Sequence, residues 1–257
     1  TLIELKKISK YLKIKKIKSN KKVFDWKVPM EYNVKSAKLL ETNGKVILDF
    51  KKNNLYLLNC SVPFNKIVSF KTLKKHLYYR RELPNAIPYR TSYYKKNWGF
   101  CLSYNQFKKL KKKKYKVEIK TNFKRGYMHY GEILIKGNSD KEIFLSTNIC
   151  HPSLANNELS GPTVLIHIAK YIEKLSKRRF SYRIIFIPET IGSIAYLSKN
   201  LKKMKKNFFA GFNCVCLGDE RDYSFLPSKN DDSNSNFFAK ESLSFFKKNF
   251  RQYSWLS

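Results

Sequence analysis

From residue 131 onward, short apolar segments alternate with longer segments of helical periodicity. The apolar segments are GEILIKG (residues 131–137), EIFLSTNIC (142–150), YRIIFIPET (182–190) and GFNCVCLGD (211–219). Between them, residues 162–177 and 191–205 carry apolar side chains at helix spacing. Strands that alternate with helices of about 15 residues are typical of a largely parallel sheet with helices on its faces. The pattern therefore predicts an α/β fold.

The chain before this region has a different character. Residues 37–127 contain short alternating segments, turns and aromatics, with a hairpin signal at Asn43-Gly44 and a helix predicted over residues 69–79 with Ser69 as its N-cap. A strand is predicted over residues 55–60. This composition predicts a small, mostly β domain without its own cluster of catalytic or metal-binding residues.

Residues 1–18 show apolar positions spaced for an amphipathic helix that continues to about Lys13. We therefore expect residues 1–36 to form a helix and linker that belong to the α/β domain. Residues 37–127 would be an inserted β-rich domain, and residues 128–257 would return to the α/β domain.

The net charge of +34 would by itself suggest a polyanionic partner such as nucleic acid. However, only nine of the 53 basic residues are Arg, and the lysines are spread along the whole chain. Asn, Ile, Phe and Tyr are also abundant, which is the mix that an AT-rich genome imposes. We attribute the charge to this bias and predict no nucleic-acid partner. Polyanion binding through the lysine run at residues 109–114 stays open as a weaker alternative.

The sequence contains no apolar run of about 18 residues, so no membrane span is predicted. Its beginning lacks the pattern of a secretory signal. Five cysteines without a CxxC pair favour a reducing, cytoplasmic compartment, and Cys214 and Cys216 are predicted to lie in a strand. Because the first residue is Thr1 and not Met, we expect the chain to be a fragment of a longer protein.

Three of the predicted strands are followed by a titratable side chain: His151, Glu189 and Asp219. The carboxyl ends of parallel strands lie at one edge of a sheet, where ligands commonly bind. Imidazole nitrogen and carboxylate oxygen are zinc ligands, and a glutamate can act as the base for a metal-activated water. The spacing thus indicates a zinc hydrolase site. The competing interpretation is a loop histidine and a turn aspartate with structural roles.

Eight motifs in order along the chain carry a resemblance to a known family. They are VFDWKVP (23–29), IPY (87–89), TSYY (91–94), WGFC (98–101), YGEILI (130–135), CHPS (150–153), NELSGP (157–162) and PETIGS (188–193). With them the chain resembles polysaccharide-biosynthesis-associated proteins with an aminopeptidase-like domain, a branch of the zinc-dependent aminopeptidase and glutaminyl cyclase superfamily. The resemblance implies an aminopeptidase-like α/β domain with a small β-rich domain inserted in it.

The resemblance also implies roles for individual residues. His151 stands at the first metal-binding histidine, Asn157 at a carboxylate that bridges two metals, and Asp219 at an aspartate ligand. Glu189 stands at the general base, and Thr190 falls on a ligand position. We expect one or two zinc ions. The neutral amide of Asn157 argues against the second ion, because it cannot replace an anionic bridge between two cations.

Two further departures from the family pattern and one neighbouring carboxylate bear on the ligand set. Ser153 stands where an aspartate would orient the imidazole, and no histidine follows His167, which is predicted to lie on a helix. Glu158 is interpreted as a carboxylate at a helix start, with replacement of the bridging group as the alternative.

The resemblance implies hydrolysis of a peptide or amide bond in an aminoacyl substrate, possible only if the ligand set is complete enough to hold zinc. The alternative is a non-catalytic binding module on the same fold that recognises a peptide, sugar or nucleotide-sugar intermediate of surface-polysaccharide assembly. Ser153, Asn157 and Thr190, at positions where carboxylates are expected, favour this alternative.

Overall fold

The computed structural model describes residues 1–219, 223–245 and 250–254. The chain forms two compact units. The α/β unit contains Thr1–Pro29 and the chain from Tyr127 onward, and the β unit is Met30–Gly126. The predicted boundary at residue 37 falls inside the long strand β4 (Glu31–Glu41), which belongs entirely to the β unit.

The α/β unit is built on a five-stranded mixed sheet in the order β1-β10-β12-β11-β13. Strand β11 pairs in parallel with both β12 and β13, whereas β10 pairs antiparallel with β1 and β12. The strands are β1 (Lys13–Lys18), β10 (Tyr127–Ile135), β11 (Glu142–Asn148), β12 (Ser181–Ile187) and β13 (Phe208–Asn213).

The expectation of a mostly parallel sheet is therefore corrected at β10. The connection from β10 to β11 spans only residues 136–141 and contains no helix. A parallel crossover needs a dozen or more residues, so this short connection reverses the chain direction.

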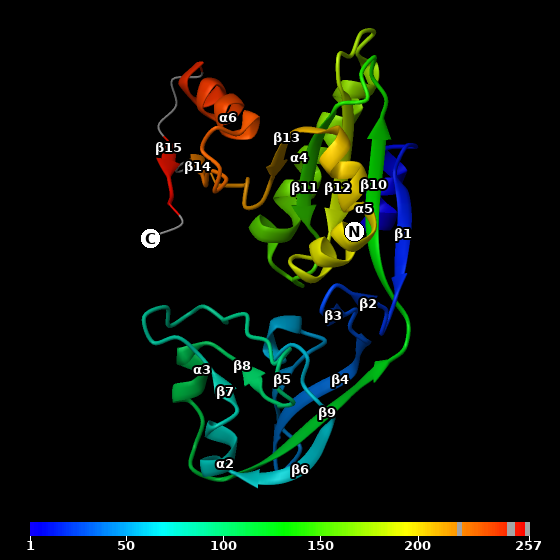
Figure 1. The fold of residues 1–257 in the computed structure, drawn as a ribbon. Helices are drawn as coiled ribbons and strands as arrows, with labels where there is room; N and C mark the ends of the chain where they lie inside the picture. Colours follow the sequence, from blue (N-terminus) through cyan, green and yellow to red (C-terminus); the bar gives the residue numbers. More distant parts are fainter. Residues whose placement is uncertain (220–222, 246–249, 255–257) are drawn as a thin grey trace. The chain divides into compact units, whose positions relative to one another are not determined.

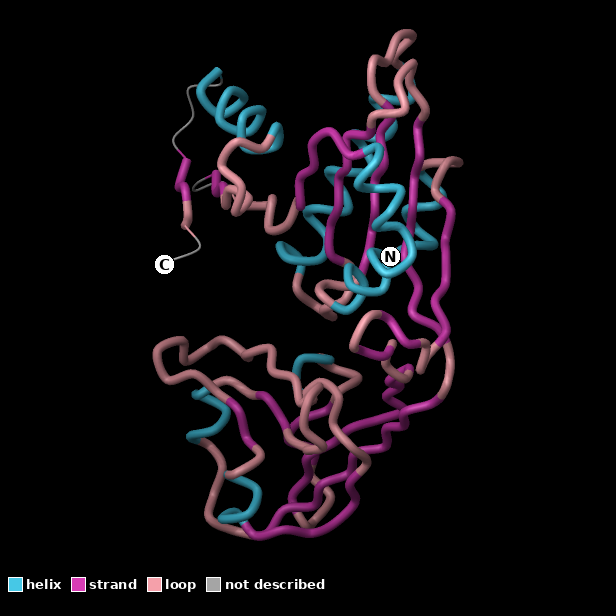
Figure 2. The backbone as a smooth tube through the Cα atoms, in the orientation of Figure 1, coloured by secondary structure: helices cyan, strands magenta, loops and turns pink. Residues whose placement is uncertain are grey.

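Helices cover both faces of this sheet (Figure 2). Alternate residues of β12 point to opposite faces: Ile184 and Phe186 enter a core with α4, whereas Ile185 and Ile187 enter a core with α5. The helices of the unit are α1 (Leu2–Ile8), α4 (Gly161–Lys174), α5 (Ile191–Asn207) and α6 (Asn234–Phe245). Two small strand pairs complete the unit: β2 (Lys22–Val23) with β3 (Trp26–Lys27), and β14 (Tyr223–Phe225) with β15 (Phe250–Gln252).

Two predictions in the α/β unit are wrong in detail. The N-terminal helix ends at Ile8 and not near Lys13, because residues 13–18 pair with β10 as an edge strand that buries Ile17. Cys214 and Cys216 lie beyond the end of β13. Cys216 has a φ of 54°, a left-handed conformation that a regular strand does not contain.

The β unit is organised around an antiparallel sheet in the order β5-β4-β9-β6. Gly44 has a φ of 90° in the turn between β4 and β5, as expected for the predicted hairpin. The strands are β4, β5 (Val46–Asp49), β6 (Phe64–Ser69) and β9 (Lys114–Lys124), and β7 (Leu77–Tyr78) pairs separately with β8 (Phe100–Cys101). Tyr115, Phe100 and Trp98 lie in its core, with Trp98 stacked between Phe64 and His76.

Short helices close the β unit. Helix α2 (Phe70–Lys74) begins at the predicted cap, where the Ser69 hydroxyl accepts a hydrogen bond from the Thr72 amide. It ends earlier than predicted because Leu77–Tyr78 forms β7. Helix α3 (Tyr104–Lys108) has a capping box, and a 3-10 turn (Asn54–Tyr56) occupies the start of the strand predicted over residues 55–60.

A buried charge network lies under α5 in the α/β unit. Arg183 of β12 donates two hydrogen bonds to Glu142, at 2.6 and 2.7 Å, and a third to Glu132. Glu132 also accepts hydrogen bonds from Tyr196, at 3.1 Å, and from Lys15. Burial acts to raise the pKa of Glu132, but the bond from Lys15 and the charge of Arg183 outweigh it and lower that pKa. The carboxylate therefore stays charged at neutral pH.

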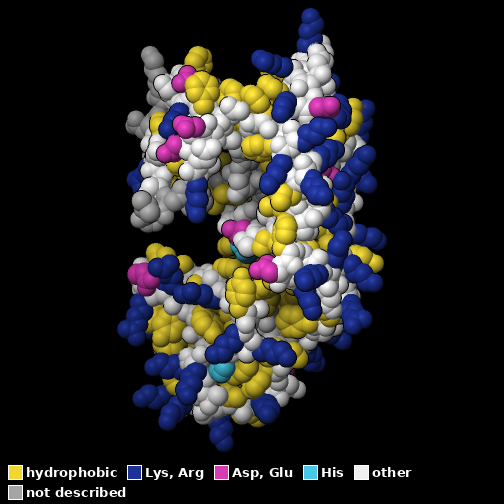
Figure 3. Space-filling model, viewed as in Figure 1, with side chains coloured by type: hydrophobic (Ala, Val, Ile, Leu, Met, Phe, Trp, Pro, Cys, Tyr) yellow, Lys and Arg dark blue, Asp and Glu magenta, His cyan; other side chains and the backbone are white. Residues whose placement is uncertain are grey.

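The large positive charge has no single location on the face shown in Figure 3, where Lys and Arg side chains are scattered over both units. Within the described residues, no helix combines the length and apolarity needed to cross a bilayer.

Candidate metal centre

Two neighbouring parallel strands deliver the candidate site. Strand β11 ends at Asn148, which lies opposite the last residue of β12, Ile187, and the Ile149 amide donates to the Ile187 carbonyl at 3.1 Å. The loop after β11 carries His151, and the loop after β12 carries Glu189. The two side chains predicted from strand ends therefore start from adjacent positions at the carboxyl edge of the sheet.

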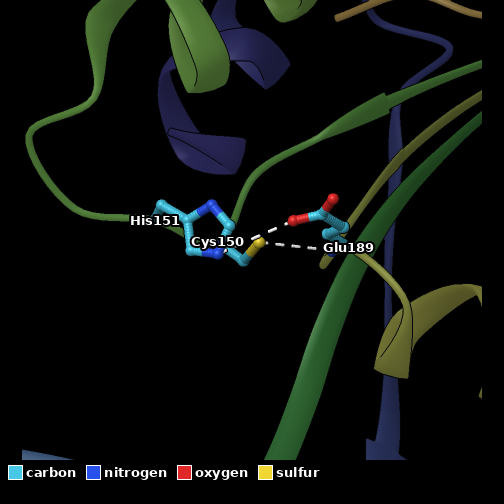
Figure 4. A group of neighbouring side chains, drawn as sticks. All are labelled: Cys150, His151 and Glu189. Atoms are coloured by element: carbon cyan, nitrogen blue, oxygen red, sulfur yellow. Dashed lines mark hydrogen bonds and ion pairs between the residues drawn. The ribbon is translucent and has the colours of Figure 1, made fainter. Parts of the chain in front are cut away.

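The structure brings His151 and Glu189 together with a third donor, Cys150 (Figure 4). His151 Nε2 lies 3.7 Å from Glu189 Oε2, and the Glu189 amide donates to Cys150 Sγ at 3.2 Å. One ligand atom from each residue lies within 4.8 Å of the other two. These three side chains can therefore approach a single ion.

Glu158 occupies the helix start that the sequence predicts, and its side chain also reaches the His151 imidazole. It lies in a π-helical turn (Asn156–Ser160) that runs directly into α4, and only 5% of its surface is exposed. Its Oε1 lies 3.0 Å from His151 Nδ1, and its Oε2 accepts a hydrogen bond from the Cys150 amide. Glu158 thus contacts the imidazole from the side opposite Glu189. The one available signal was the missing carboxylate at Ser153, which left the imidazole without its usual orienting group.

Asp219 is not in the group of three donors, and Asn157 belongs to a residue type that this grouping of His, Cys, Asp and Glu does not include. The side-chain oxygen of Asn157 is buried, and among the described residues it has no hydrogen-bond partner. The segment before Asp219 is tied to the π-helical turn, because the Gly218 amide donates to Asn156 Oδ1 at 2.7 Å and the Leu217 amide to Ser160 Oγ at 2.8 Å. Asp219 thus follows a segment whose backbone is held against the π-helical turn.

The Cys150 thiol is not prepared for nucleophilic attack. Burial raises its pKa to about 12, and the negative charges of Glu158 and Glu189 act in the same direction. Without a metal the group is a neutral thiol at pH 7, whereas nucleophilic cysteines react as thiolates. A cysteine-hydrolase mechanism at this loop is therefore disfavoured.

A cavity of about 550 Å³ opens beside the His151 loop. Its lining includes His151, Cys150 and Glu158 together with the apolar side chains of Ile149 and Leu159. This volume lies within the range of small-molecule sites, and the lining combines a few polar groups with apolar wall.

The α/β unit thus has a mixed sheet with helices on both faces and carries a histidine and a glutamate after two adjacent parallel strands. The chain belongs to the family described as domain of unknown function DUF4910, whose profile matches residues 1–257.

Two matches from Clostridium acetobutylicum cover most of this chain. A Clostridium acetobutylicum protein, named as a candidate polysaccharide biosynthesis protein with aminopeptidase-like domain, is 45% identical over 208 residues, which are 81% of this chain and 48% of the relative. A crystal structure of a candidate peptidase from Clostridium acetobutylicum matches with a TM-score of 0.90 at 39% identity, over 96% of this chain and 59% of that one. The chain thus spans about half the length of the curated relative.

The fold similarity extends to a zinc aminopeptidase from Bacillus subtilis. That structure matches with a TM-score of 0.64 at 12% identity, over 98% of this chain and 71% of that one. At this identity the match shows a shared fold alone, and the chemistry has to be argued from the residues of this chain.

Proposed function

We propose that this chain is the aminopeptidase-like part of a zinc metallohydrolase that cleaves a peptide or amide bond in an aminoacyl substrate. The observation that carries the proposal is the imidazole of His151, which is held between Glu158 at 3.0 Å and Glu189 at 3.7 Å. Metal-binding histidines usually have a carboxylate at the ring nitrogen that does not bind the metal, and Glu158 stands in that place at ion-pair distance, without hydrogen-bond geometry.

The proposal assumes one zinc ion. Imidazole nitrogen and carboxylate oxygen are the donors that zinc takes in hydrolases, and we assign His151, Asn157 and Asp219 as ligands. The buried oxygen of Asn157 has no partner in the described part of the chain, so a cation would satisfy it. Since Asn157 is neutral, it supports one ion and not a bridged pair.

Each side chain has a separate role in the proposed reaction. A bound zinc would polarise the substrate carbonyl and lower the pKa of its water. Glu189 accepts a proton from the attacking water and returns it to the leaving amine. Glu158 Oε1 lies at ion-pair distance from His151 Nδ1, without the geometry of a hydrogen bond, and Nε2 lies on the side of Glu189. The adjoining cavity gives the aminoacyl group a place beside the loop.

The biological setting is part of the same proposal. The name of the Clostridium acetobutylicum relative supports a role in polysaccharide biosynthesis. All five cysteines are free, which supports a reducing compartment such as the cytoplasm.

Hydrolysis assays test the proposal. The protein that carries this chain is incubated with a panel of aminoacyl anilides and dipeptides, either loaded with zinc or stripped with a chelator. We expect release of product that requires zinc. Protein that retains zinc but cleaves none of the panel would contradict the proposal and favour the binding-module alternative.

Replacing Glu158 with glutamine is expected to weaken zinc binding by about 10- to 100-fold, because the neutral amide no longer stabilises the imidazole as a ligand. Competition with a chromophoric chelator measures the dissociation constant. Glu4→Gln serves as control, because it removes the same charge from an exposed position on α1. An unchanged constant in Glu158→Gln would exclude this role for Glu158.

A further inference from the structure

Cys150 is a half-buried thiol with no part in the mechanism above, although it precedes His151 directly. Its Sγ accepts the Glu189 amide hydrogen bond at 3.2 Å and lies 3.8 Å from Glu158 Oε1. Figure 4 shows the sulfur and the imidazole on the side of the loop that faces Glu189. The backbone amide of Glu189, after β12, thus holds the Cys150 sulfur next to the His151 ring, and both of these residues follow β11.

The distances suit two ligands of one ion. The nearest donor atoms of Cys150, His151 and Glu189 lie within 4.8 Å of one another. With Zn–S and Zn–N bonds of about 2.3 and 2.0 Å, ligands of a tetrahedral ion are separated by about 3.3–3.8 Å. Small side-chain rotations would close that difference without moving either strand.

The charge of the site also calls for another anionic donor. Asn157 and Thr190 are neutral at positions where the family resemblance implies carboxylates. A thiolate would supply negative charge directly beside His151, and it is a common zinc ligand. Thiolate ligands favour zinc and cobalt, whereas magnesium, calcium and manganese prefer oxygen.

We propose that Cys150 is a metal ligand together with His151, which makes this a thiolate–imidazole centre that discriminates against oxygen-seeking cations. As the metal–sulfur bond forms, the Sγ–H proton is released to water, so one proton leaves for each ion bound. Cys150 would take one of the three protein positions of a hydrolytic zinc site and leave the fourth for a water near Glu189, so at most one of Asn157 and Asp219 would also bind the ion. The inference rests on the proposed function in one respect, that this loop binds a metal.

The test replaces zinc with Co²⁺, because a cobalt–thiolate bond gives a near-ultraviolet charge-transfer band that oxygen and nitrogen ligands do not give. We expect the band in the wild-type chain and in Cys214→Ser, whose thiol lies outside the donor group. Cys150→Ser should lose the band. It should also bind zinc at least about 10- to 100-fold more weakly, because that is the loss when even a residue that only supports a ligand is changed.

The outcomes separate this inference from the proposed function. Wild-type protein that binds cobalt without the band overturns the ligand role of Cys150 but leaves a zinc hydrolase with nitrogen and oxygen ligands. A band that persists in Cys150→Ser also overturns it, since another thiol must then hold the metal. Absence of any bound cobalt contradicts both proposals. If Cys150→Ser does not fold, the wild-type spectrum still decides.

Discussion

Replacing Glu189 with glutamine is expected to lower kcat for aminoacyl hydrolysis by about 100- to 10,000-fold while zinc stays bound. Glutamine keeps the size and polarity of the side chain but cannot accept the proton of the attacking water. Glu189 is half exposed and lies 3.7 Å from His151 Nε2 through its Oε2 atom, close enough to reach a water on an ion held there. Steady-state kinetics with parallel metal analysis measure both quantities.

A matched control is Glu241→Gln, which removes the same charge from an exposed position on α6 in the same unit. It should leave kcat unchanged. Glu189→Gln protein with wild-type kcat would show that Glu189 is not the base. Loss of zinc in that variant would show instead that Glu189 is a ligand.

Replacing Arg183 with methionine is expected to lower the free energy of unfolding by about 3–5 kcal/mol, because it leaves two buried carboxylates without their shared cation. The Arg183 side chain is 7% exposed, and those of Glu132 and Glu142 are 6% and 5% exposed. Burial acts to lower the pKa of Arg183, but its bond to Glu142 and the nearby negative charges outweigh this and raise it. Arg183 is therefore the cation that Glu132 and Glu142 share in the buried network.

Urea denaturation of the wild-type protein, of Arg183→Met and of a control variant measures the change in the free energy of unfolding. Arg179→Met removes the same charge from an exposed position just before β12 and should change the unfolding free energy by less than about 0.5 kcal/mol. A loss below about 1 kcal/mol in Arg183→Met would contradict the account of the buried network.

Much of the α/β fold could be predicted because its strands and helices are separated by clear changes of hydrophobic period. Residues 162–177 and 191–205 correspond to α4 and α5 within a few residues. The direction of β10 could not be obtained from its composition, since an apolar strand looks the same in parallel and antiparallel pairs. The length of the connection at residues 136–141 was the informative feature.

The candidate site was predictable only where it depends on strand ends. His151 and Glu189 follow adjacent parallel strands, so their proximity follows from the topology. The inward positions of Glu158 and Cys150 depend on loop backbone that composition does not specify. Ser153 has a φ of 60° and residues 156–160 form a π-helical turn, and both lie between His151 and α4. A continuous α-helix in their place would have changed the direction of the Glu158 side chain.

The roles assigned to Asn157 and Asp219 stay predictions. Both lie at the carboxyl end of the sheet, on segments that the hydrogen bonds from Gly218 and Leu217 hold together. Whether they complete the ligand set is a question of metal stoichiometry, which also decides between a hydrolase and a binding module.

The most direct test of the account is the zinc content of the purified protein after zinc loading and exhaustive dialysis, measured by inductively coupled plasma mass spectrometry. The proposed centre predicts about one zinc per chain in the wild type and less than about 0.2 in His151→Ala, because the imidazole is the ligand around which the other donors are arranged. Wild-type protein with less than about 0.2 zinc per chain would contradict the metalloenzyme account.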